Sequence, residues 1–374
     1  MVGGGQLARM SVGPAAALGI GFRVLAHSWS DPAAQVARDV RIGAHDDLGA
    51  LKKFADGCQV LTFDHEHVPP AHLEQLESMG VAVRPGPSAL FHAQDKIHMR
   101  QSLTDLGIPG PQWAVVDSVT EVADFAARAG WPLVLKMSRG GYDGRGVWVV
   151  DSPDSAAVVL SNPLPSGARW LAEEHIEFVQ EISAQVARSP HGQAVAYPIS
   201  MTTQVGGICA EVVSPCPGLS ESMTLQAQEM ALSIAGSLGV VGMLAVEMFD
   251  TGSGLLVNEL AMRPHNSGHW TIEGAVTCQF ENHLRAVLDL PLGSPRARAP
   301  YAVMVNIIGG DADDLYSAYR HVLARDPGLK VHLYGKQVRP GRKLGHVTAL
   351  GHDFRDLLER CRHASDYFAG VVDE

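Results

Sequence analysis

The segment Lys136-Met-Ser-Arg-Gly-Gly-Tyr-Asp-Gly-Arg-Gly146 places a lysine at the end of an apolar stretch and follows it with a loop that contains four glycines. Glycines let the backbone fold closely over a ligand, and successive N–H groups of such a loop form an anion-binding nest. A glycine-rich hairpin turn with a structural role is the alternative, and the glycines alone favour it. The charged residues Lys136, Asp143 and Arg145 favour a loop that covers a polyphosphate.

Two carboxylates, Glu247 and Glu259, lie on strand-like segments joined by the turn Asp250-Thr-Gly-Ser-Gly254. In a hairpin centred on this turn they fall on one face, nearly opposite each other. Like charges in that arrangement destabilise a sheet unless a cation lies between them, and carboxylate oxygens are the ligands that magnesium prefers. The pattern favours a magnesium site over an exposed edge with two solvated glutamates. The apolar neighbours expected on the same face are Ala245, Phe249, Val257 and Ala261.

The segment Asn258-Glu-Leu-Ala-Met-Arg-Pro-His-Asn-Ser-Gly-His-Trp270 concentrates histidines, an arginine and amides. Polar loops of this kind commonly bind ligands. Two histidine pairs, His265 with His269 and His65 with His67, have no third ligand at a recognisable zinc spacing. A cluster of arginine, histidine and asparagine beside a magnesium site suits a small oxyanion and its phosphorylated form.

A fourth segment, Lys336-Gln-Val-Arg-Pro-Gly-Arg-Lys-Leu-Gly-His346, is a cationic turn. It could form a phosphate clamp. Taken alone, it is more typical of a basic surface loop.

Composition restricts the class of protein. With 374 residues, 46% of them hydrophobic, the chain can form two or three packed domains. Its longest apolar stretches are too short for a membrane span, and a net charge of −11 argues against a nucleic-acid surface. The five scattered cysteines and the absence of a secretory signal pattern predict a reduced, cytoplasmic protein.

The first ninety residues alternate short apolar runs with helix-like stretches, which predicts a parallel α/β unit. Gly3 to Gly5 precede Gln6 and Leu7, so we expect a tight turn whose free N–H groups hold a phosphate at the start of a helix. Only Met1 and Val2 precede this turn, whereas a buried strand usually has about five residues. We therefore expect a truncated first strand, and a true start upstream of Met1 is a hypothesis.

Beyond Pro85-Gly-Pro87, residues Gln94 to Leu106 read as one amphipathic helix, and mixed helices and strands follow, as in an α+β domain. Pro291, Pro295 and Pro300 indicate a linker to a small terminal domain. The predicted domains are 1–90, 91–293 and 294–374. The strands predicted after residue 130 are Leu133–Lys136, Val147–Val150, Leu244–Phe249, Leu255–Leu260, Val303–Ile307, Lys330–Leu333 and Val347–Leu350, with a helix at Ser220–Leu238.

Together these segments resemble the ATP-grasp family, and within it the 5-(carboxyamino)imidazole ribonucleotide synthases, over nearly the whole chain. The markers are Gly3-Gly-Gly-Gln-Leu7, Gly140-Gly-Tyr-Asp-Gly-Arg-Gly146, Asn258-Glu259 with His265-Asn-Ser-Gly-His-Trp270, and Arg339-Pro-Gly-Arg-Lys343. The resemblance implies an ATP-grasp fold, α/β and α+β in class, with an N-terminal Rossmann-like domain and a small C-terminal β-rich domain.

The resemblance also implies a reaction. Such enzymes use ATP and Mg²⁺ to phosphorylate bicarbonate, and the carboxyphosphate delivers carbon dioxide to the amine of 5-aminoimidazole ribonucleotide in purine biosynthesis. It further suggests a homodimer.

Residue roles follow from the same resemblance. Lys96 and Lys136 are expected at the ATP phosphates under the loop Gly141, Tyr142, Asp143, Gly144, Arg145 and Gly146. Glu173, Glu174 and Ile176 are expected at adenine, Glu181 at the ribose, and Glu247 and Glu259 at magnesium, with Asn258 beside them. Arg263, His265 and Asn266 are expected at bicarbonate, and Tyr142, Asp143 and Arg145 at the aminoimidazole, where Asp143 could accept the amine proton. The ribonucleotide phosphate is expected at Gln6, Leu7, Lys336, Arg342 and Lys343, with Lys336 among the catalytic residues.

The sequence departs from the family pattern at three places, the first of which is the truncated first strand before the Gln6 loop. Many members carry a histidine near Gln204, and Asp64-His-Glu-His67 replaces a more usual Glu-aromatic-Glu-Asn. Another ATP-grasp carboxylate–amine ligase or a formate-dependent transformylase is the alternative activity. A dinucleotide-dependent oxidoreductase fits less well, because the full G-x-G-x-x-G spacing is absent. A homologue that binds the nucleotide without turnover is a further alternative.

Overall fold

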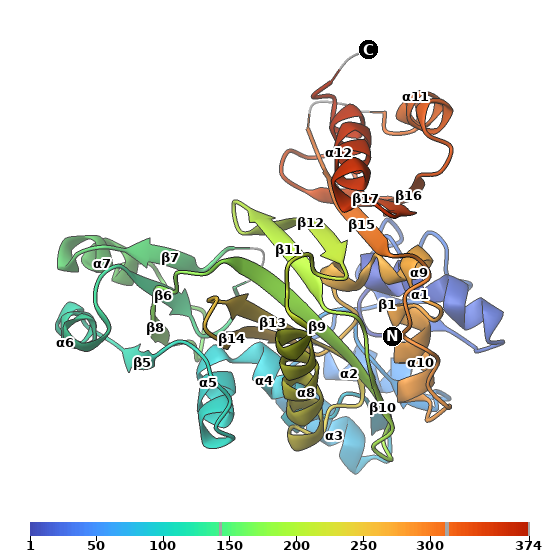
Figure 1. Ribbon diagram of the computed structural model, residues 1–374. Helices are drawn as coiled ribbons and strands as arrows, with labels where there is room; N and C mark the ends of the chain where they lie inside the picture. Colours follow the sequence, from blue (N-terminus) through green and yellow to red (C-terminus); the bar gives the residue numbers. More distant parts are fainter. Residues whose placement is uncertain (142–143, 311–313, 373–374) are drawn as a thin grey trace.

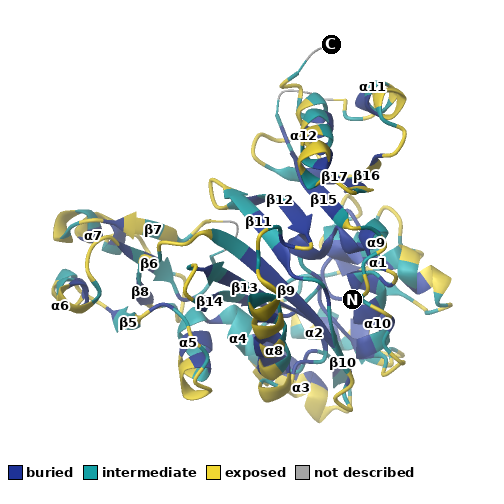
Figure 2. Ribbon diagram, in the orientation of Figure 1, coloured by how far each residue is buried: buried dark blue, intermediate teal, exposed yellow. Residues whose placement is uncertain are grey.

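The computed structural model describes residues 1–141, 144–310 and 314–372. A lobe at the left, an N-terminal unit at the lower right and a C-terminal unit at the top surround a central antiparallel sheet (Figure 1). Figure 2 shows that the strands of the central sheet are largely buried, while the outer helices expose one face. No helix in the described part of the chain is both long and apolar enough to cross a membrane.

The N-terminal unit is a parallel α/β layer built around a very short first strand. Val2 forms parallel bridges with Leu25 on one side and Phe63 on the other, so this one residue links the strand pairs β1–β2 and β3–β4. The expectation of a short first strand is therefore confirmed. The elements of this unit are α1 (Gln6–Ala17), β1 (Arg23–Ala26), β2 (Asp39–Ile42), α2 (Leu48–Ala55), β3 (Val60–Leu61), α3 (Pro70–Ser78), β4 (Ala82–Val83) and α4 (Pro87–Gln94).

The helix predicted from Gln94 to Leu106 is present as α5 (Lys96–Asp105) and begins two residues later than expected. Helix α4 ends at Gln94, and α5 begins after Asp95. Asp95 is extended, and its carboxylate accepts hydrogen bonds from the backbone N–H groups of Ile97 and His98. An aspartate that caps a helix in this way ends the preceding helix and starts a new one.

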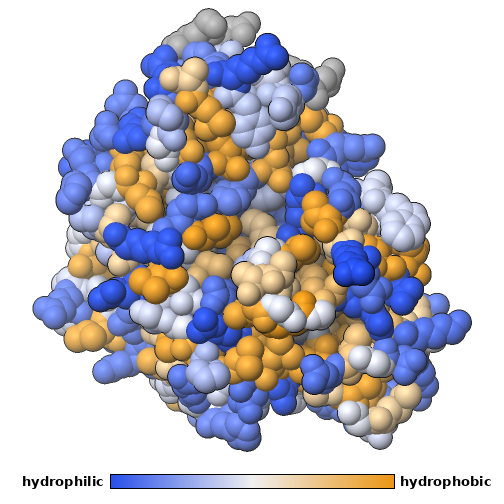
Figure 3. All heavy atoms as spheres, turned by 90° about the vertical axis from the view of Figure 1, so that its right-hand side faces the viewer, coloured by the Kyte–Doolittle hydropathy of each residue, from blue (hydrophilic) through white to orange (hydrophobic). Residues whose placement is uncertain are grey.

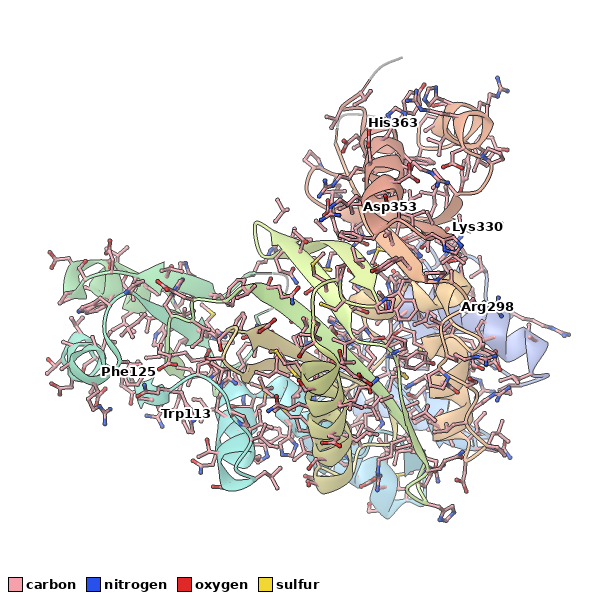
Figure 4. All side chains as sticks on the ribbon, in the orientation of Figure 1. Trp113, Phe125, Arg298, Lys330, Asp353 and His363 are labelled. Carbon is pink, nitrogen blue, oxygen red and sulfur yellow. The ribbon has the colours of Figure 1, made fainter. Side chains whose placement is uncertain are left out.

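The lobe that follows is a small antiparallel sheet in the order β5-β8-β6-β7, with two helices packed on it. Ser118 and Glu121 form a capping box that starts its first helix. Trp113 and Phe125 mark this lobe at the left of Figure 4. Its elements are β5 (Trp113–Val116), α6 (Val119–Ala129), β6 (Leu133–Met137), β7 (Val147–Val150), α7 (Pro153–Leu160) and β8 (Trp170–Glu174).

The central sheet runs in the order β14-β13-β9-β11-β12-β15-β17-β16, and β10 pairs with β9. Helices α8 and α10 pack against β9 and β13, and the buried core there includes Ile182, Leu244 and Ile234. The elements between the lobe and the terminal unit are β9 (Gln180–Arg188), β10 (Ala194–Ala196), β11 (Ser200–Val205), β12 (Ile208–Ser214), α8 (Glu221–Ser237), β13 (Gly242–Asp250), β14 (Leu255–Ala261), η1 (Asn266–Gly268), α9 (Thr271–Gly274) and α10 (Gln279–Val287).

The C-terminal unit continues the central sheet. Strand β15 pairs antiparallel with β12 from Glu211↔Val305 to Ser214↔Ala302, and α12 packs on β15 and β17. On the face in Figure 3, hydrophilic and hydrophobic residues are interspersed. The elements of this unit are β15 (Tyr301–Ile308), α11 (Ala318–Arg325), β16 (Lys330–Leu333), β17 (Lys343–Gly351) and α12 (Phe354–Ala369).

Candidate active site

The two glutamates predicted as a pair lie directly opposite each other. Strands β13 and β14 form a hairpin in which Glu247 is the cross-strand partner of Glu259. The next pair is Met248 with Val257, so the register shifts and Asn258 is the extra residue of a β-bulge. Because of this bulge Val257 lies on the face of Met248, and the prediction that it shares the face of the glutamates is wrong.

Electrostatics around this pair favour a bound cation. Partial burial, together with the neighbouring charge of Glu259, raises the pKa of Glu247 to about 7. Burial would also raise the pKa of Glu259, but the Lys96 ammonium, which forms an ion pair with it, keeps that pKa below its usual value. Two facing carboxylates with one ammonium between them leave negative charge uncompensated, which suits a divalent cation.

The structure gives this cation only part of its ligand shell. Within the described residues, no cluster of three or more His, Cys, Asp or Glu side chains could hold a metal ion by itself. A magnesium ion at Glu247 and Glu259 would therefore take its other ligands from water or from a phosphate, as magnesium does in nucleotide sites. The donor set fits Mg²⁺ delivered with a nucleotide.

Lys136 is held in place by a buried ion-pair network at the base of the lobe. Its Nζ lies 2.7 Å from Glu173 Oε2 and donates to Asn258 Oδ1 at 3.1 Å. Arg100 Nε lies 2.6 Å from the other Glu173 oxygen, and its NH1 and NH2 donate to the carbonyl oxygens of Val257 and Asn258 at 2.6 and 2.8 Å. Arg100 thus holds the bulge that directs Asn258 toward Lys136.

Burial governs the protonation of this network. Desolvation lowers the pKa of Lys136 despite its pairing with Glu173. Burial would raise the pKa of Glu173, but Lys136 and Arg100 outweigh it and lower that pKa to about 2. The Glu173 carboxylate is therefore ionised at neutral pH.

The adenine residues predicted from the resemblance divide into two sets. Both carboxylate oxygens of Glu173 are engaged by Arg100 and Lys136, so its side chain anchors the lysine. Glu174 and Ile176 instead line a cavity of about 510 Å³. Glu181, on the neighbouring β9, is partly buried, and this burial raises its pKa. The other residues that line the cavity are Pro109, His175, Glu177, Gln226, Thr251, Ser253, Gly254, Leu255 and Leu256.

The glycine loop approaches the turn between β11 and β12. Gly144 has φ +74°, and a Cβ there would lie 2.9 Å from the Cα of Gly207. Only glycine allows this contact between backbones. Arg145 is exposed beside it. The predicted residues Tyr142 and Asp143 lie outside the described residues.

The residues expected at bicarbonate divide in the same way. Arg263 Nε forms an ion pair of 2.7 Å with Glu66 of the N-terminal unit. His265 Nε2 faces Glu247 Oε1 at 3.7 Å, and burial lowers the pKa of His265 to about 3. Asn266 is buried, and its amide makes a reciprocal pair of hydrogen bonds with the Asn306 amide at 3.1 and 2.7 Å. The structure therefore brings His265 to the carboxylates, while the Asn266 amide is engaged elsewhere.

The glycine turn at the N-terminus differs from the expectation. The Asp64 carboxylate accepts hydrogen bonds from the backbone N–H of Gly5 and, at 3.1 Å, from that of Ala8. The prediction that the N–H groups here are free for a phosphate is therefore wrong for these two donors. Burial raises the pKa of Asp64. Leu7 is buried, and its side chain packs in the interior.

The cationic turn near the C-terminus meets the N-terminal unit. Lys336 Nζ donates to Gln6 Oε1 at 2.5 Å, and Gln35 Nε2 donates to the Gly335 carbonyl at 2.8 Å. Arg342 donates to the Gln337 carbonyl at 3.3 Å. The positive charge of Lys343 opposes the rise in the pKa of Glu247, so Lys343 lies within electrostatic range of the carboxylate pair. Residues from both ends of the chain thus converge on one region.

Sequence reasoning missed four side chains that hold the predicted residues. Arg100, Glu66, Asp64 and Asn306 each pair with or cap a predicted residue or segment. Arg100 carried a usable signal, because it lies at helical spacing from the apolar Leu103, and an arginine on the apolar face of a helix requires a buried partner. The identity of each partner depends on contacts forty or more residues apart in sequence, which no local pattern contains.

Comparison with known proteins agrees with this geometry. Residues 1–94 match a ribonucleotide synthetase preATP-grasp domain, residues 101–280 an ATP-grasp domain, and residues 302–360 a phosphoribosylaminoimidazole carboxylase C-terminal domain. The N5-carboxyaminoimidazole ribonucleotide synthase of Mycobacterium bovis is 51% identical over 99% of this chain and 87% of its own length. That of Corynebacterium ammoniagenes is 42% identical over 100% of this chain and 92% of its own length.

Solved structures agree as well. N5-carboxyaminoimidazole ribonucleotide synthetase from Thermus thermophilus has a TM-score of 0.87 and 37% identity, covering 100% of this chain and 99% of its own. The Aspergillus clavatus enzyme, in complex with ADP and 5-aminoimidazole ribonucleotide, has a TM-score of 0.89 and 32% identity, covering 98% of each chain. The ATP-grasp fold and its flanking N- and C-terminal units are thus confirmed. The chain belongs to the N5-carboxyaminoimidazole ribonucleotide synthase family of ATP-grasp proteins.

Proposed function

We propose that the chain catalyses the ATP-dependent carboxylation of 5-aminoimidazole ribonucleotide by bicarbonate, with release of ADP and phosphate, in purine biosynthesis. One observation carries the proposal in a chain of this family. Glu247 and Glu259 face each other beside Lys96, and His265 lies 3.7 Å from Glu247. A cation site, a phosphate-binding lysine and an oxyanion donor therefore lie side by side.

Lys96 and Lys136 bind the nucleotide phosphates in this proposal. Glu247 and Glu259 would hold Mg²⁺, which would supply charge neutralisation for the transferred phosphoryl group. In the free protein Lys96 pairs with Glu259, and release of this ion pair would free the Lys96 ammonium for phosphate. The tether of Lys136 to Glu173 and Asn258 keeps its ammonium at one position throughout. Gly141, Gly144, Arg145 and Gly146 cover the phosphates.

The cavity beside β14 takes the adenine, with Glu174 and Ile176 at its wall and Glu181 at the ribose hydroxyls. Glu173 contributes through Lys136 rather than by direct contact. Its carboxylate is anionic and doubly paired, so it fixes the lysine beneath the nucleotide.

Bicarbonate binds next to Glu247, where His265 donates from Nε2 and Arg263 supplies positive charge. A bicarbonate oxygen attacks the γ-phosphorus, forming carboxyphosphate and releasing ADP. Carboxyphosphate then yields carbon dioxide and phosphate, and the amine of the ribonucleotide attacks the carbon and loses a proton. Because carboxyphosphate hydrolyses readily, the site must exclude water and hold both partners close together. Asn266 supports this loop from its pairing with Asn306.

The ribonucleotide occupies the region where both ends of the chain meet. Lys336, held by Gln6, and the cations Arg342 and Lys343 bind its phosphate, and Leu7 supports the turn from the interior. Tyr142, Asp143 and Arg145 are assigned to the aminoimidazole by the resemblance, with Asp143 as the acceptor of the amine proton. The proposal also includes three domains, 1–90, 91–293 and 294–374. It further includes a homodimeric state and a cytoplasmic location.

The decisive experiment measures ADP release by the purified chain with ATP and Mg²⁺. 5-Aminoimidazole ribonucleotide and bicarbonate are added separately and together. We expect full release only with both, and formation of labelled carbamate from labelled bicarbonate. Formate in place of bicarbonate, and glycine in place of the ribonucleotide, are the controls for the alternative ATP-grasp reactions. ADP release driven by formate or by another amine would overturn the named reaction.

A further inference from the structure

The loop that carries His265 is fixed by an amide on α10. Gln279 Oε1 accepts the backbone N–H of His265 at 2.8 Å, and Gln279 Nε2 donates to the carbonyl oxygen of the same residue at 2.8 Å. The Gln279 backbone N–H donates to Thr271 Oγ1 at 3.0 Å, so the clamp is itself held. Gln279 is fully buried. The His265 main chain thus has both of its polar groups bound by one side chain.

The imidazole of His265 is fixed by a second set of contacts centred on Ser267. Ser267 Oγ lies 2.8 Å from His265 Nδ1, 2.7 Å from Ser183 Oγ and 2.9 Å from Gln185 Nε2. Ser267, Ser183 and Gln185 are all buried. A hydroxyl offers one hydrogen and two lone pairs, so these three contacts use the full hydrogen-bonding capacity of the Ser267 hydroxyl.

The direction of these hydrogen bonds follows from their donors. The backbone N–H of Ser267 points to His265 Nδ1 at 3.4 Å, and an N–H can only donate, so Nδ1 is an acceptor. The Ser267 hydroxyl therefore gives its hydrogen to Nδ1 as well. Its two lone pairs then accept from the Gln185 amide and from the Ser183 hydroxyl. A neutral imidazole with an accepting Nδ1 carries its hydrogen on Nε2.

We propose that Ser267, backed by Ser183 and Gln185, is a positioning residue that locks His265 in the Nε2–H tautomer, so that His265 presents a hydrogen-bond donor to the reacting oxyanion. The proposal rests on the function proposed above. Nε2 is the ring atom that faces Glu247, at 3.7 Å from Oε1, and therefore the side on which bicarbonate and the γ-phosphate meet. A donor aimed in advance at developing negative charge needs no reorganisation during the reaction.

The opposite tautomer would change the chemistry of the site. With its hydrogen on Nδ1, His265 would turn the lone pair of Nε2 toward Glu247 and toward any bound oxyanion. Two acceptors would then face each other, which repels the substrate instead of binding it. Ser267 therefore determines whether His265 Nε2 attracts or repels the bound oxyanion, although Ser267 itself does not contact the substrate.

The test reads the tautomer directly in the ligand-free protein. Histidine-specific ¹⁵N labelling with two-bond ¹H–¹⁵N correlation spectra distinguishes a protonated Nε2 from a protonated Nδ1, and the His265 signals are identified by their loss in His265→Gln. We expect the wild-type protein to carry the hydrogen on Nε2. In Ser267→Ala the hydroxyl donor at 2.8 Å is lost and only the longer backbone N–H contact of 3.4 Å remains, so we expect Nδ1–H to be populated. The kcat for bicarbonate-dependent ADP release should fall about tenfold or more, with the KM for ATP unchanged.

Two further variants separate positioning from general damage to the fold. Gln185→Met keeps the shape but removes the amide donor behind Ser267, and we expect a smaller change in the same two measurements. Ser214→Ala removes the hydroxyl of a buried serine on β12 that makes no hydrogen bond among the described residues, and we expect it to match the wild type in both. Circular dichroism and thermal melts establish that each variant is folded.

Every outcome decides the proposal. A wild-type His265 with its hydrogen on Nδ1 overturns it, and so does a Ser267→Ala protein whose tautomer is unchanged. A changed tautomer with unchanged kcat also overturns it, because positioning would then have no effect on the reaction. If Ser267→Ala does not fold, the Gln185→Met spectrum and kcat decide in the same way. Because the tautomer is read without substrate, failure of the proposed carboxylation would be seen separately in the wild-type assay.

Discussion

The buried carboxylate of Glu173 offers the sharpest test of how the lobe is held. Replacing it in Glu173→Gln leaves the shape nearly unchanged but removes the charge that faces Arg100 at 2.6 Å and Lys136 at 2.7 Å. Two cations would then remain buried with no anion between them. Breaking a buried pair by removing one partner costs about 3 to 5 kcal/mol of unfolding free energy.

The pKa of Glu173 leads to the same magnitude. Burial is outweighed by Lys136 and Arg100, and the pKa falls from 4.5 to about 2. At about 1.4 kcal/mol for each pH unit, this difference corresponds to roughly 3 kcal/mol of stability at neutral pH. Because the folded pKa lies below the unfolded one, this stability is present above pH 4.5 and is lost as the pH falls toward 2.

The assay is urea unfolding at 25 °C followed by tryptophan fluorescence, since Trp170 is buried on the same strand as Glu173. The matched control is Asp117→Asn, which breaks an ion pair of 2.6 Å with Arg169 in the same lobe, where both side chains are more than half exposed. An exposed pair contributes less than about 1 kcal/mol. The reasoning is refuted if Glu173→Gln loses no more stability than Asp117→Asn, or if its deficit does not shrink between pH 7 and pH 3.

Three further predictions concern the reaction site. Glu247 has its pKa raised to about 7 by partial burial and by the charge of Glu259. Since this folded pKa exceeds the unfolded value, the contribution of Glu247 to stability is lost as the pH rises from 4.5 through 7. In EDTA, Glu247→Gln should therefore raise the thermal midpoint at pH 8 more than at pH 5.5. Equal shifts of the midpoint at the two pH values would contradict this reasoning. Glu259→Gln should abolish ADP release while its circular dichroism spectrum stays that of the wild type, and an active variant would remove the magnesium assignment. Gly144→Ala would place a Cβ 2.9 Å from the Cα of Gly207, so the KM for ATP should rise at least about tenfold. The control is Gly218→Ala, where φ is a similar +78° and the space around the residue is open. This variant should leave the KM for ATP unchanged and lower the unfolding free energy by only about 1 kcal/mol.

Local patterns predicted the strands that carry the chemistry. The predicted bounds Val147–Val150 and Lys330–Leu333 agree with β7 and β16, and the hairpin of Glu247 and Glu259 forms as the turn between them indicates. The alternation of apolar and polar side chains and the turn residues are short-range features of the sequence. Strands predicted from them therefore do not depend on distant contacts. The α/β and α+β classes followed from these patterns, whereas the ATP-grasp fold followed from the resemblance.

The errors arose where one residue changes the geometry. The bulge at Asn258 reverses the face of Val257, and the cap at Asp95 starts the helix predicted from Gln94 at Lys96 instead. The Asp64 carboxylate occupies N–H groups of the glycine turn from the far side of the first strand. Each depends on a particular hydrogen bond that propensity and periodicity do not contain.

The pairing of β12 with β15 has a mechanical consequence. A ladder of backbone hydrogen bonds from Glu211↔Val305 to Ser214↔Ala302 joins the strands of the central sheet and of the C-terminal unit into one continuous sheet. Lys343 lies at the start of β17 in this sheet, and Lys336 lies in the segment between β16 and β17. The glycine loop belongs to the separate small sheet of the lobe. The cations proposed to bind the ribonucleotide phosphate are therefore tied to the central sheet by strand pairing, whereas no strand pairing among the described residues joins the sheet of the lobe to it.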